Sequence, residues 1–209
     1  MYRLIVGVLG VLGLAAYLVL AVPETALADI ASDDEATEGK IIGDPNAKVT
    51  VIEYVSLGCP HCANFHFDVF PKIKKEYVDT GKVKFLFRDF PLGTPSVAAA
   101  MIARCAGPKR YFPMIDIFFK AQHQWSHAPN PLEALKKTAR FGGMSSADVD
   151  ACIANQTLLN SIQQKAQAAQ LDHEINSTPS FVIEGRKIAG GLPYADFKKV
   201  LDEALAAAN

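Results

Sequence analysis

The sequence predicts an α/β protein in which a helical segment interrupts a β-sheet domain. Three observations lead to this fold class. Residues 49–93 show a strand pattern, a helix pattern and a second strand pattern, joined by short links. Residues 94–172 are almost entirely helical in their pattern, and residues 173–209 return to strands before a final helix. Because sheet-forming segments flank the helical stretch, we expect that stretch to be inserted into the sheet domain.

Residues 1–28 have the composition of an export segment. Arg3 precedes an uncharged apolar run from Leu4 to Val22, and Ala26-Leu27-Ala28 matches the small-x-small pattern of a cleavage site. Two interpretations remain open: a signal peptide cleaved after Ala28, or an uncleaved membrane anchor, which needs about 20 apolar residues. Either one predicts an exported protein. Residues 29–48 begin with a strongly acidic stretch and are expected to form a flexible lead-in.

The first half of the sheet domain is predicted as a strand–helix–strand unit. Lys48 to Ser56 is rich in β-branched apolar residues, which favours a buried strand. Aromatic and aliphatic residues then recur at near-helical spacing from Pro60 to about Thr80, and Pro71 should kink this helix. Gly81 ends it, and Lys82 to Phe87 alternates like a second strand. Short links in such a unit place the two strands parallel.

The insertion and the C-terminal segment complete the predicted element order. Five helices are expected in the insertion, over residues 96–105, 111–125, 131–141, a fourth that begins at Ser145, and 157–172. Ser180 to Ile183 and Lys187 to Ala189 flank Gly185, which predicts a hairpin, and an amphipathic helix starts at Pro193. No coiled-coil or repeat pattern is present, so a monomer is expected.

Cys59-Pro60-His61-Cys62 is the motif with the most chemical content. Two thiols separated by two residues can close a reversible disulfide, and Cys59 falls where the predicted strand meets the helix. Unpaired N–H groups and the positive end of the helix dipole favour a thiolate there, and the thiolate is the nucleophile. A zinc half-site or an inert bridge is the alternative, but zinc requires two more ligands and none is evident.

The other two cysteines, Cys105 and Cys152, both fall in the helical insertion. We interpret them as a structural disulfide that joins two helices, worth about 4 kcal/mol in the chain-entropy model. Two separate buried thiols, or a second catalytic pair, are the alternatives. His123 and His127 have i, i+4 spacing, but no nearby carboxylate or Cys accompanies them, so we expect neither a metal site nor a cofactor. The net charge of −1 and the absence of a basic stripe argue against a nucleic-acid partner.

The chain resembles the DsbA-like thiol:disulfide oxidoreductases of the bacterial periplasm, members of the thioredoxin superfamily. The resemblance is carried by Val51 to Cys62 (VIEYVSLGCPHC) and by Ser177 to Phe181 (STPSF), and it covers roughly residues 40–209. It implies a thioredoxin-like fold with an inserted all-helical domain. It also implies a periplasmic location.

The resemblance extends to the residues of the Cys motif and the strand before it. Cys59 is the expected nucleophile and Cys62 the resolving thiol that breaks a mixed disulfide, with Pro60 between them. His61 can donate a hydrogen bond or present positive charge to Cys59, or is a solvated loop residue. Glu53 is implied as the proton acceptor of Cys62, and burial in its apolar strand should raise its pKa. The alternative for Glu53 is an edge-strand carboxylate that faces water.

Thr178 and Pro179 form the second implied site element. In the thioredoxin fold a cis proline faces the disulfide and offers backbone groups to an extended substrate. Sequence alone would not predict the cis bond, because only about 5–6% of X-Pro bonds in folded proteins are cis. Thr178 departs from the best-known oxidases, which carry Val there, and Thr is common in reductase or isomerase relatives. The direction of electron flow therefore stays open.

The predicted function is an enzyme that introduces disulfides into reduced or unfolded exported proteins through a mixed disulfide. A membrane quinone-linked partner resembling DsbB is expected to reoxidise it. A disulfide isomerase or reductase is one alternative, and a non-redox peptide-binding or chaperone module is another. An apolar groove beside the Cys pair is expected to bind extended chains. Candidates for its rim are Leu57, Pro91, Leu92 and Leu192.

Overall fold

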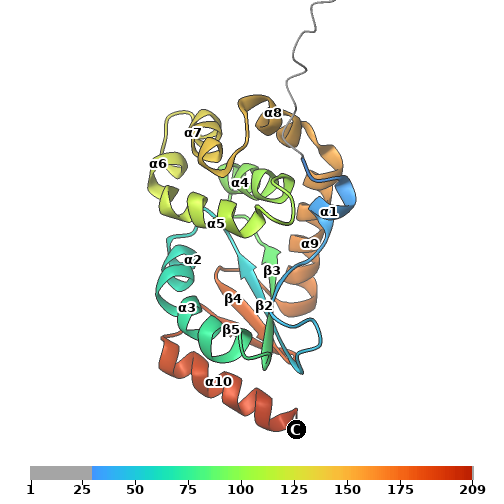
Figure 1. Ribbon diagram of the computed structural model, residues 1–209, viewed down its shortest axis with the longest axis vertical. Coiled ribbons are helices and arrows are strands. Elements are labelled where there is room, and N and C mark those ends of the chain that lie inside the picture. Colours follow the sequence, from blue (N-terminus) through green and yellow to red (C-terminus); the bar gives the residue numbers. More distant parts are fainter. Residues whose placement is uncertain (1–29, 209) are drawn as a thin grey trace, which may run out of the picture.

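In the computed structural model, which describes residues 30–208, a five-stranded sheet carries helices on both faces and a helical domain at one end (Figure 1). This is the predicted thioredoxin-like architecture with an inserted helical domain. The predicted export segment, residues 1–28, lies outside the described residues. Within residues 30–208 no helix has the length and apolar character needed to cross a membrane.

The sheet has the strand order β1-β3-β2-β4-β5. The strands are β1 (Lys40–Ile42), β2 (Val49–Val55), β3 (Val83–Asp89), β4 (Ser180–Ile183) and β5 (Arg186–Ala189). β2 and β3 are parallel, as predicted, whereas β1, β4 and β5 pair antiparallel with their neighbours. β2 therefore lies at the centre of the sheet, and the loop that follows it leads into the Cys motif.

The helix after β2 is one continuous segment with two wider turns. It consists of α2 (Pro60–Asn64), the π-helical turn η1 (Phe65–Val69), α3 (Phe70–Ile73) and the π-helical turn η2 (Lys74–Val78). Pro71, which was predicted to kink this helix, is the second residue of α3, two positions after the end of η1. The wider hydrogen-bonding pattern of a π turn changes the helical register at the point where proline removes a donor.

An aromatic core attaches this helix to one face of the sheet. The ring of Phe65 lies 4.6 Å from that of Phe181 on β4, and Phe70 lies 5.7 Å from Phe87 on β3. The C-terminal helix α10 (Tyr194–Ala207) adds Phe197, whose ring is 4.9 Å from Phe181. Offset and edge-to-face ring pairs at these distances stabilise a core beyond the area that they bury.

The helical domain spans α4 to α8, and the long helix α9 returns the chain to the sheet (Figure 1). The elements are α4 (Thr94–Cys105), α5 (Tyr111–Lys120), α6 (Gln122–Ser126), α7 (Pro131–Ala139), the 3-10 turn η3 (Arg140–Gly142), α8 (Ser146–Ala154) and α9 (Gln156–His173). The helix predicted over residues 111–125 is two helices, divided at Ala121. α9 covers the second face of the sheet, where Ala169 packs with Tyr54 and Val182.

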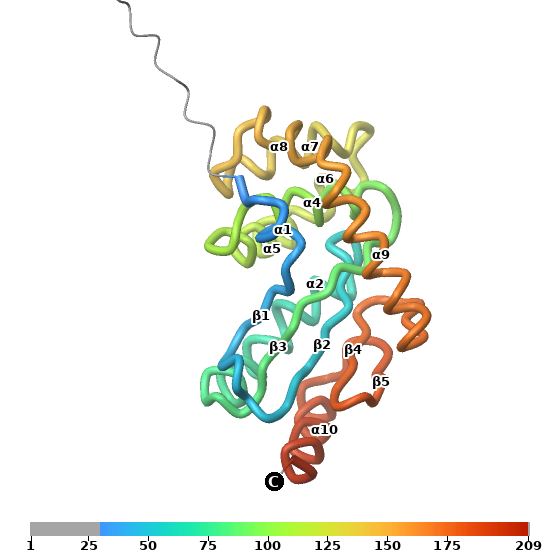
Figure 2. Tube along the Cα trace, turned by 90° about the vertical axis from the view of Figure 1, so that its right-hand side faces the viewer, coloured from blue at the N-terminus to red at the C-terminus, as the bar shows by residue number. Residues whose placement is uncertain are grey.

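The prediction of a flexible lead-in over residues 29–48 is wrong for the described part. A capping box between Ser32 and Glu35 begins helix α1 (Asp33–Thr37), and β1 follows as the edge strand beside β3 (Figure 2). The guanidinium of Arg104 donates to the carbonyl of Ala36 at 3.0 Å and to that of Glu38 at 2.9 Å. Residues 33–42 are therefore fixed to the rest of the fold largely through hydrogen bonds of their backbone atoms. The acidic composition of a segment does not predict such contacts.

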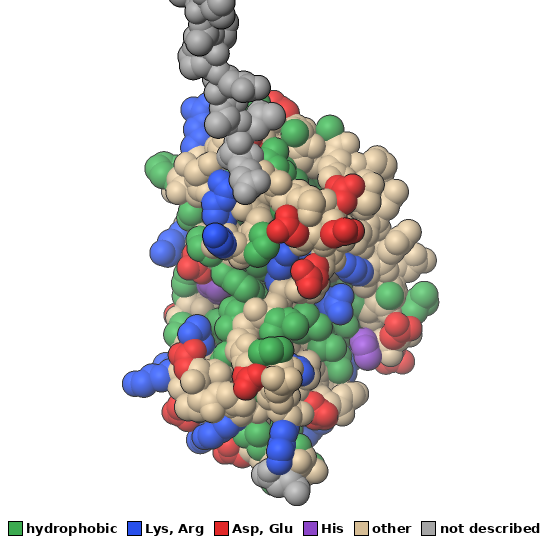
Figure 3. All heavy atoms as spheres, turned by 45° about the vertical axis from the view of Figure 1, so that its right-hand side comes forward, with side chains coloured by type: hydrophobic (Ala, Val, Ile, Leu, Met, Phe, Trp, Pro, Cys, Tyr) green, Lys and Arg blue, Asp and Glu red, His purple; other side chains and the backbone are tan. Residues whose placement is uncertain are grey.

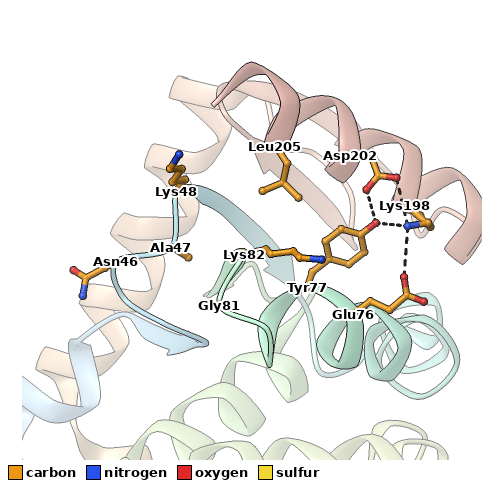
Figure 4. Close-up of a pocket in the computed structure, with 10 residues that line it drawn as sticks. All are labelled: Asn46, Ala47, Lys48, Glu76, Tyr77, Gly81, Lys82, Lys198, Asp202 and Leu205. Carbon is orange, nitrogen blue, oxygen red and sulfur yellow. Dashed lines mark hydrogen bonds and ion pairs between the residues drawn. The ribbon is translucent and has the colours of Figure 1, made fainter. Parts of the chain in front are cut away.

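A cavity of about 530 Å³ lies between α10, η2 and the starts of β2 and β3, at the end of the sheet far from the Cys motif (Figure 4). The hydroxyl of Tyr77 donates to Asp202 at 2.6 Å and accepts from the ammonium of Lys198 at 2.8 Å. Lys198 also pairs with Glu76 at 3.5 Å. These contacts join α10 to η2, so the residues that line the cavity help to hold α10 in place.

Candidate active site

The two cysteines of the C-x-x-C motif lie where the loop after β2 enters α2. Cys59 is the N-cap of α2, and its N–H donates to the carbonyl of Ser56 at 3.0 Å, which closes the turn. Both cysteines are free thiols. Cys59 is 7% exposed and Cys62 is fully buried, so the Cys59 sulfur is the one that an incoming thiol can reach.

The surroundings of the two sulfurs move their acidities in opposite directions. A hydrogen bond from the Cys62 thiol, supported by the backbone N–H groups of Cys62 and His61, lowers the pKa of Cys59 to about 5, against the opposing effect of burial. Burial, together with the neighbouring Cys59, raises the pKa of Cys62 well above its usual range. At neutral pH the pair is therefore one thiolate and one thiol.

A loop distant in sequence completes the surroundings of Cys59. The Cys59 thiol, when protonated, donates to the carbonyl of Thr178 at 3.2 Å, although the two residues are 119 positions apart. The Thr178–Pro179 peptide bond is cis. The N–H of Gly190 donates to the carbonyl of Pro179 at 2.9 Å, which holds this loop against the end of β5. The Thr178 hydroxyl is buried and has no hydrogen-bond partner among residues 30–208.

Glu53 is buried in the centre of the sheet. In the sheet register it lies between Phe87 on β3 and Phe181 on β4, and paired residues point to the same face. Because those two rings pack on the helix that carries Cys62, Glu53 also points toward that helix. It has no hydrogen bond or ion pair among residues 30–208 and is 2% exposed. Burial raises the pKa of Glu53 to about 8.

The helical domain holds the active-site loop by two contacts that the sequence analysis did not identify. The side-chain amide of Gln122, on α6, donates to the carbonyl of Leu57 at 2.7 Å and to that of Cys59 at 3.0 Å. A Cβ atom at Gly58 would lie 2.2 Å from the Ser96 hydroxyl, so this position has room only for glycine. Gly58 directly precedes the Cys59-Pro60-His61-Cys62 motif, so the sequence could have indicated it. No local sequence pattern indicates a role for Gln122.

A groove of about 230 Å³ opens beside the Cys motif. One wall is the helix that begins at Pro60, and the other is the loop before α10. Its lining residues are His61, Asn64, Phe65, Asp68, Val69, Gly191, Leu192 and Pro193. Gly191 lies against Pro179, because a Cβ atom there would be 3.6 Å from the proline ring. The groove therefore adjoins the Thr178–Pro179 loop through Gly191.

Of the four residues predicted to form the rim of the groove, only one lines it. Leu192 lines the groove. Leu57 is buried and so is not at a rim. Pro91 and Leu92 follow β3 on the far side of the Ser56 turn, where the N–H of Leu92 donates to the Ser56 hydroxyl at 3.2 Å. The face in Figure 3 shows a central area of hydrophobic side chains with acidic and basic ones interspersed around it.

Cys105 and Cys152 are joined by a disulfide between α4 and α8, with their Cα atoms 6.0 Å apart. It closes a chain separation of 47 residues inside the helical domain. The rings of His123 and His127 stack at 4.7 Å. Among residues 30–208 no group of three or more His, Cys, Asp or Glu side chains is arranged to hold a metal ion.

Comparison with known proteins agrees with this geometry. Residues 35–203 match the family model described as Thioredoxin. The crystal structure of Wolbachia pipientis alpha-DsbA1 superposes with a TM-score of 0.76 and 31% identity, covering 82% of this chain and 92% of that chain. "Disulfide bond formation protein D" of Bacillus subtilis is 24% identical over 190 residues, covering 85% of this chain and 82% of that protein.

A relative from Rickettsia bellii, named "Putative protein-disulfide oxidoreductase", is 30% identical over 146 residues, which cover 69% of this chain and 56% of that protein. Across the rickettsial relatives the matched region spans 54% to 61% of the length of those proteins. The family-model match nevertheless covers most of the chain, and the Wolbachia structure is matched over nearly its whole length. The chain therefore belongs to the thioredoxin family and, within it, to the DsbA-like proteins.

Proposed function

We propose that this protein is a thiol:disulfide oxidoreductase that introduces disulfides into reduced exported proteins through Cys59 and Cys62. The observation that carries the proposal is the Cys59 sulfur, which belongs to the more exposed cysteine of the pair, lies at a helix N-cap and has a pKa lowered to about 5. A stabilised thiolate makes the reduced pair more favourable and hence the disulfide more oxidising. The names of relatives from several bacteria support the same class of reaction.

In the proposed cycle, a thiolate of a reduced client attacks the Cys59 sulfur of the Cys59–Cys62 disulfide. A mixed disulfide forms between client and Cys59, and Cys62 leaves as a thiolate that takes up a proton. The client's second thiolate then attacks the client sulfur of the mixed disulfide and releases Cys59. The client loses two electrons and the protein gains them, so Cys59 ends as the stabilised thiolate.

Glu53 is the proposed proton donor and acceptor of Cys62. A carboxyl with a pKa of about 8 is mostly protonated at neutral pH, so it can supply the proton that the departing Cys62 requires. When the pair is oxidised again, the carboxylate can take the proton back. The orientation of Glu53 toward the helix that carries Cys62 supports this role.

The proposed client approaches as an extended chain in the groove that starts at His61. The cis Thr178–Pro179 loop offers its backbone groups beside Cys59, which suits the recognition of a main chain without a fixed sequence. We place the enzyme in the periplasm, either soluble after cleavage at Ala28 or anchored by Leu4 to Val22. A membrane quinone-linked protein resembling DsbB is the proposed reoxidant.

Thr178 favours one alternative, an isomerase or reductase with the same chemistry in the other direction. The test is the equilibrium constant of the Cys59–Cys62 disulfide with glutathione. We expect a strongly oxidising pair, and a potential more reducing than about −200 mV would favour the alternative. Ultraviolet absorbance of the thiolate against pH provides the physical check, and an ordinary alkaline pKa at Cys59 would remove the basis of the proposal.

A non-redox peptide-binding or chaperone module is the remaining alternative. It needs the groove but not the sulfur. Cells that lack the protein would be complemented with a Cys59→Ser variant. Full complementation would favour this alternative over the oxidoreductase.

A further inference from the structure

The groove beside the Cys motif combines apolar walls with one carboxylate. Phe65, Val69, Leu192 and Pro193 contribute the apolar surface. Asp68, on the π-helical turn η1, is the only acidic residue among the lining residues, and it is exposed.

The structure gives Asp68 no partner. Among residues 30–208 its carboxylate forms no ion pair and no hydrogen bond. Lys72 follows one helical turn later and could have neutralised it. Its ammonium instead lies 6.0 Å over the ring of Tyr194. The groove therefore presents a carboxylate that has no ion-pair partner among residues 30–208.

Such a lining fits a long basic side chain. Lys and Arg bury an aliphatic stem along apolar surface while the charged end stays near water. In this groove the stem would lie along Val69 and Leu192, and the charge would reach Asp68. A carboxylate side chain in the same place would meet like charge and be disfavoured.

The distance along the helix indicates where in a client this side chain would be. Asp68 lies nine positions after Cys59, and the rise is about 1.5 Å per residue in α2 and smaller in the π-helical turn, so the two are separated by at most about 13 Å along the axis. An extended chain advances about 3.3 Å per residue. The basic residue would therefore be about four positions from the reacting cysteine of the client.

We propose that Asp68 is a specificity-determining residue that selects clients with Lys or Arg about four residues from the reacting cysteine. The inference rests on the proposed function, because it assigns a substrate class to the same site. It predicts a charge preference that depends on this one carboxylate and weakens as salt is added.

The test uses synthetic dithiol peptides that differ at one position, four residues before or after the reactive cysteine. That position is Arg, Glu or citrulline, the neutral analogue of Arg. The readout is the ratio of kcat/KM for the Arg peptide to kcat/KM for the citrulline peptide. We expect a ratio of about two to five at one of the two positions, as for a partly exposed ion pair. In Asp68→Asn the ratio should fall to about one, and in Asp68→Lys below one.

Asp34→Asn is the matched control, because it removes an exposed carboxylate on α1, outside the groove. It should keep the wild-type ratio. A wild-type ratio of one at both positions, or a preference that survives in Asp68→Asn, would overturn the inference while leaving the proposed function intact.

A second readout does not need redox turnover. The same peptides with serine in place of cysteine are titrated against the protein by fluorescence anisotropy. If no dithiol peptide is oxidised, the proposed function fails, and the binding ratio between the Arg and citrulline peptides alone decides the role of Asp68. Equal affinities would reject it, and a preference lost in Asp68→Asn would support it.

Discussion

The two cysteine pairs of this chain are both buried, but they differ in bonding and in sequence spacing. Cys59 and Cys62 are free thiols within one turn of a helix start, whereas Cys105 and Cys152 are bridged across 47 positions between two helices. Yet Cys59, Cys62, Cys105 and Cys152 are 7%, 0%, 1% and 1% exposed.

Burial alone therefore does not decide whether a cysteine is reactive. The N–H groups at the start of α2 and the Cys62 thiol point at the Cys59 sulfur and stabilise its charge. Cys105 is the last residue of α4, where carbonyl groups end the helix and disfavour an anion. The direction of the local dipoles thus distinguishes Cys59 from Cys105.

Replacing Cys59, the proposed nucleophile, should have the largest effect. Cys59→Ser should reduce dithiol oxidation to the uncatalysed background, because a hydroxyl at this position cannot form a disulfide. Far-ultraviolet circular dichroism should remain that of the wild type. Residual turnover in this variant would mean that Cys62 or the second pair carries the reaction.

Removing the structural pair should affect stability instead of chemistry. The double variant Cys105→Ala, Cys152→Ala is expected to lose about 4 kcal/mol of unfolding free energy in urea, from the loop-closure term for this chain separation. Its exchange rate should stay close to that of the wild type. In the wild type, mild reduction should expose two reactive thiols. Four equally reactive thiols would contradict the assignment of Cys105 and Cys152 as a protected structural disulfide.

Glu53→Gln tests the buried carboxyl. Burial raises the pKa of Glu53 to about 8, so the folded state binds a proton that the unfolded chain releases near pH 4.5. The free energy of unfolding of the wild type should therefore be highest below pH 4.5. It should decrease between pH 4.5 and pH 8, by at most about 1.4 kcal/mol per pH unit. The variant should lack that fall and should exchange disulfides more slowly at neutral pH. An unchanged exchange rate would remove Glu53 from the mechanism.

Gln122→Ala should have the smallest effect on activity and stability among these substitutions. The buried carbonyl of Leu57 would lose this donor, which costs about 1–3 kcal/mol, whereas the carbonyl of Cys59 would keep the N–H groups of Cys62 and Ala63. We expect a moderate loss of stability and a slower reaction of Cys59 with a thiol reagent. Gln124→Ala, two positions away and exposed, is the control. Equal reactivity of Cys59 in the two variants would show that the helical domain does not hold the loop in place.

The sequence predicts the parts of this molecule that depend on neighbouring residues. Strand alternation in β3, the Cys motif and the hairpin around Gly185 are local patterns, and each predicted the observed element. The contact of Cys59 with Gln122 joins positions 63 apart and nothing in the sequence predicted it, whereas the contact with Thr178, 119 positions away, was expected only from the family resemblance. Helix α1 and strand β1 were missed because composition outweighed the S-x-x-E capping signal at Ser32, which was present in the sequence.

The long separation between Cys59 and Thr178 also bears on how the protein is made. A ribosome delivers both thiols of the motif well before it delivers Thr178 and α10. An unfinished chain holds a Cys59 that lacks the Thr178 carbonyl and the loop that forms the second wall of the groove. Under the proposed function, client binding therefore requires the C-terminal strands to have joined the sheet, and we expect the nascent chain to be a substrate for oxidation before it can act as an oxidant.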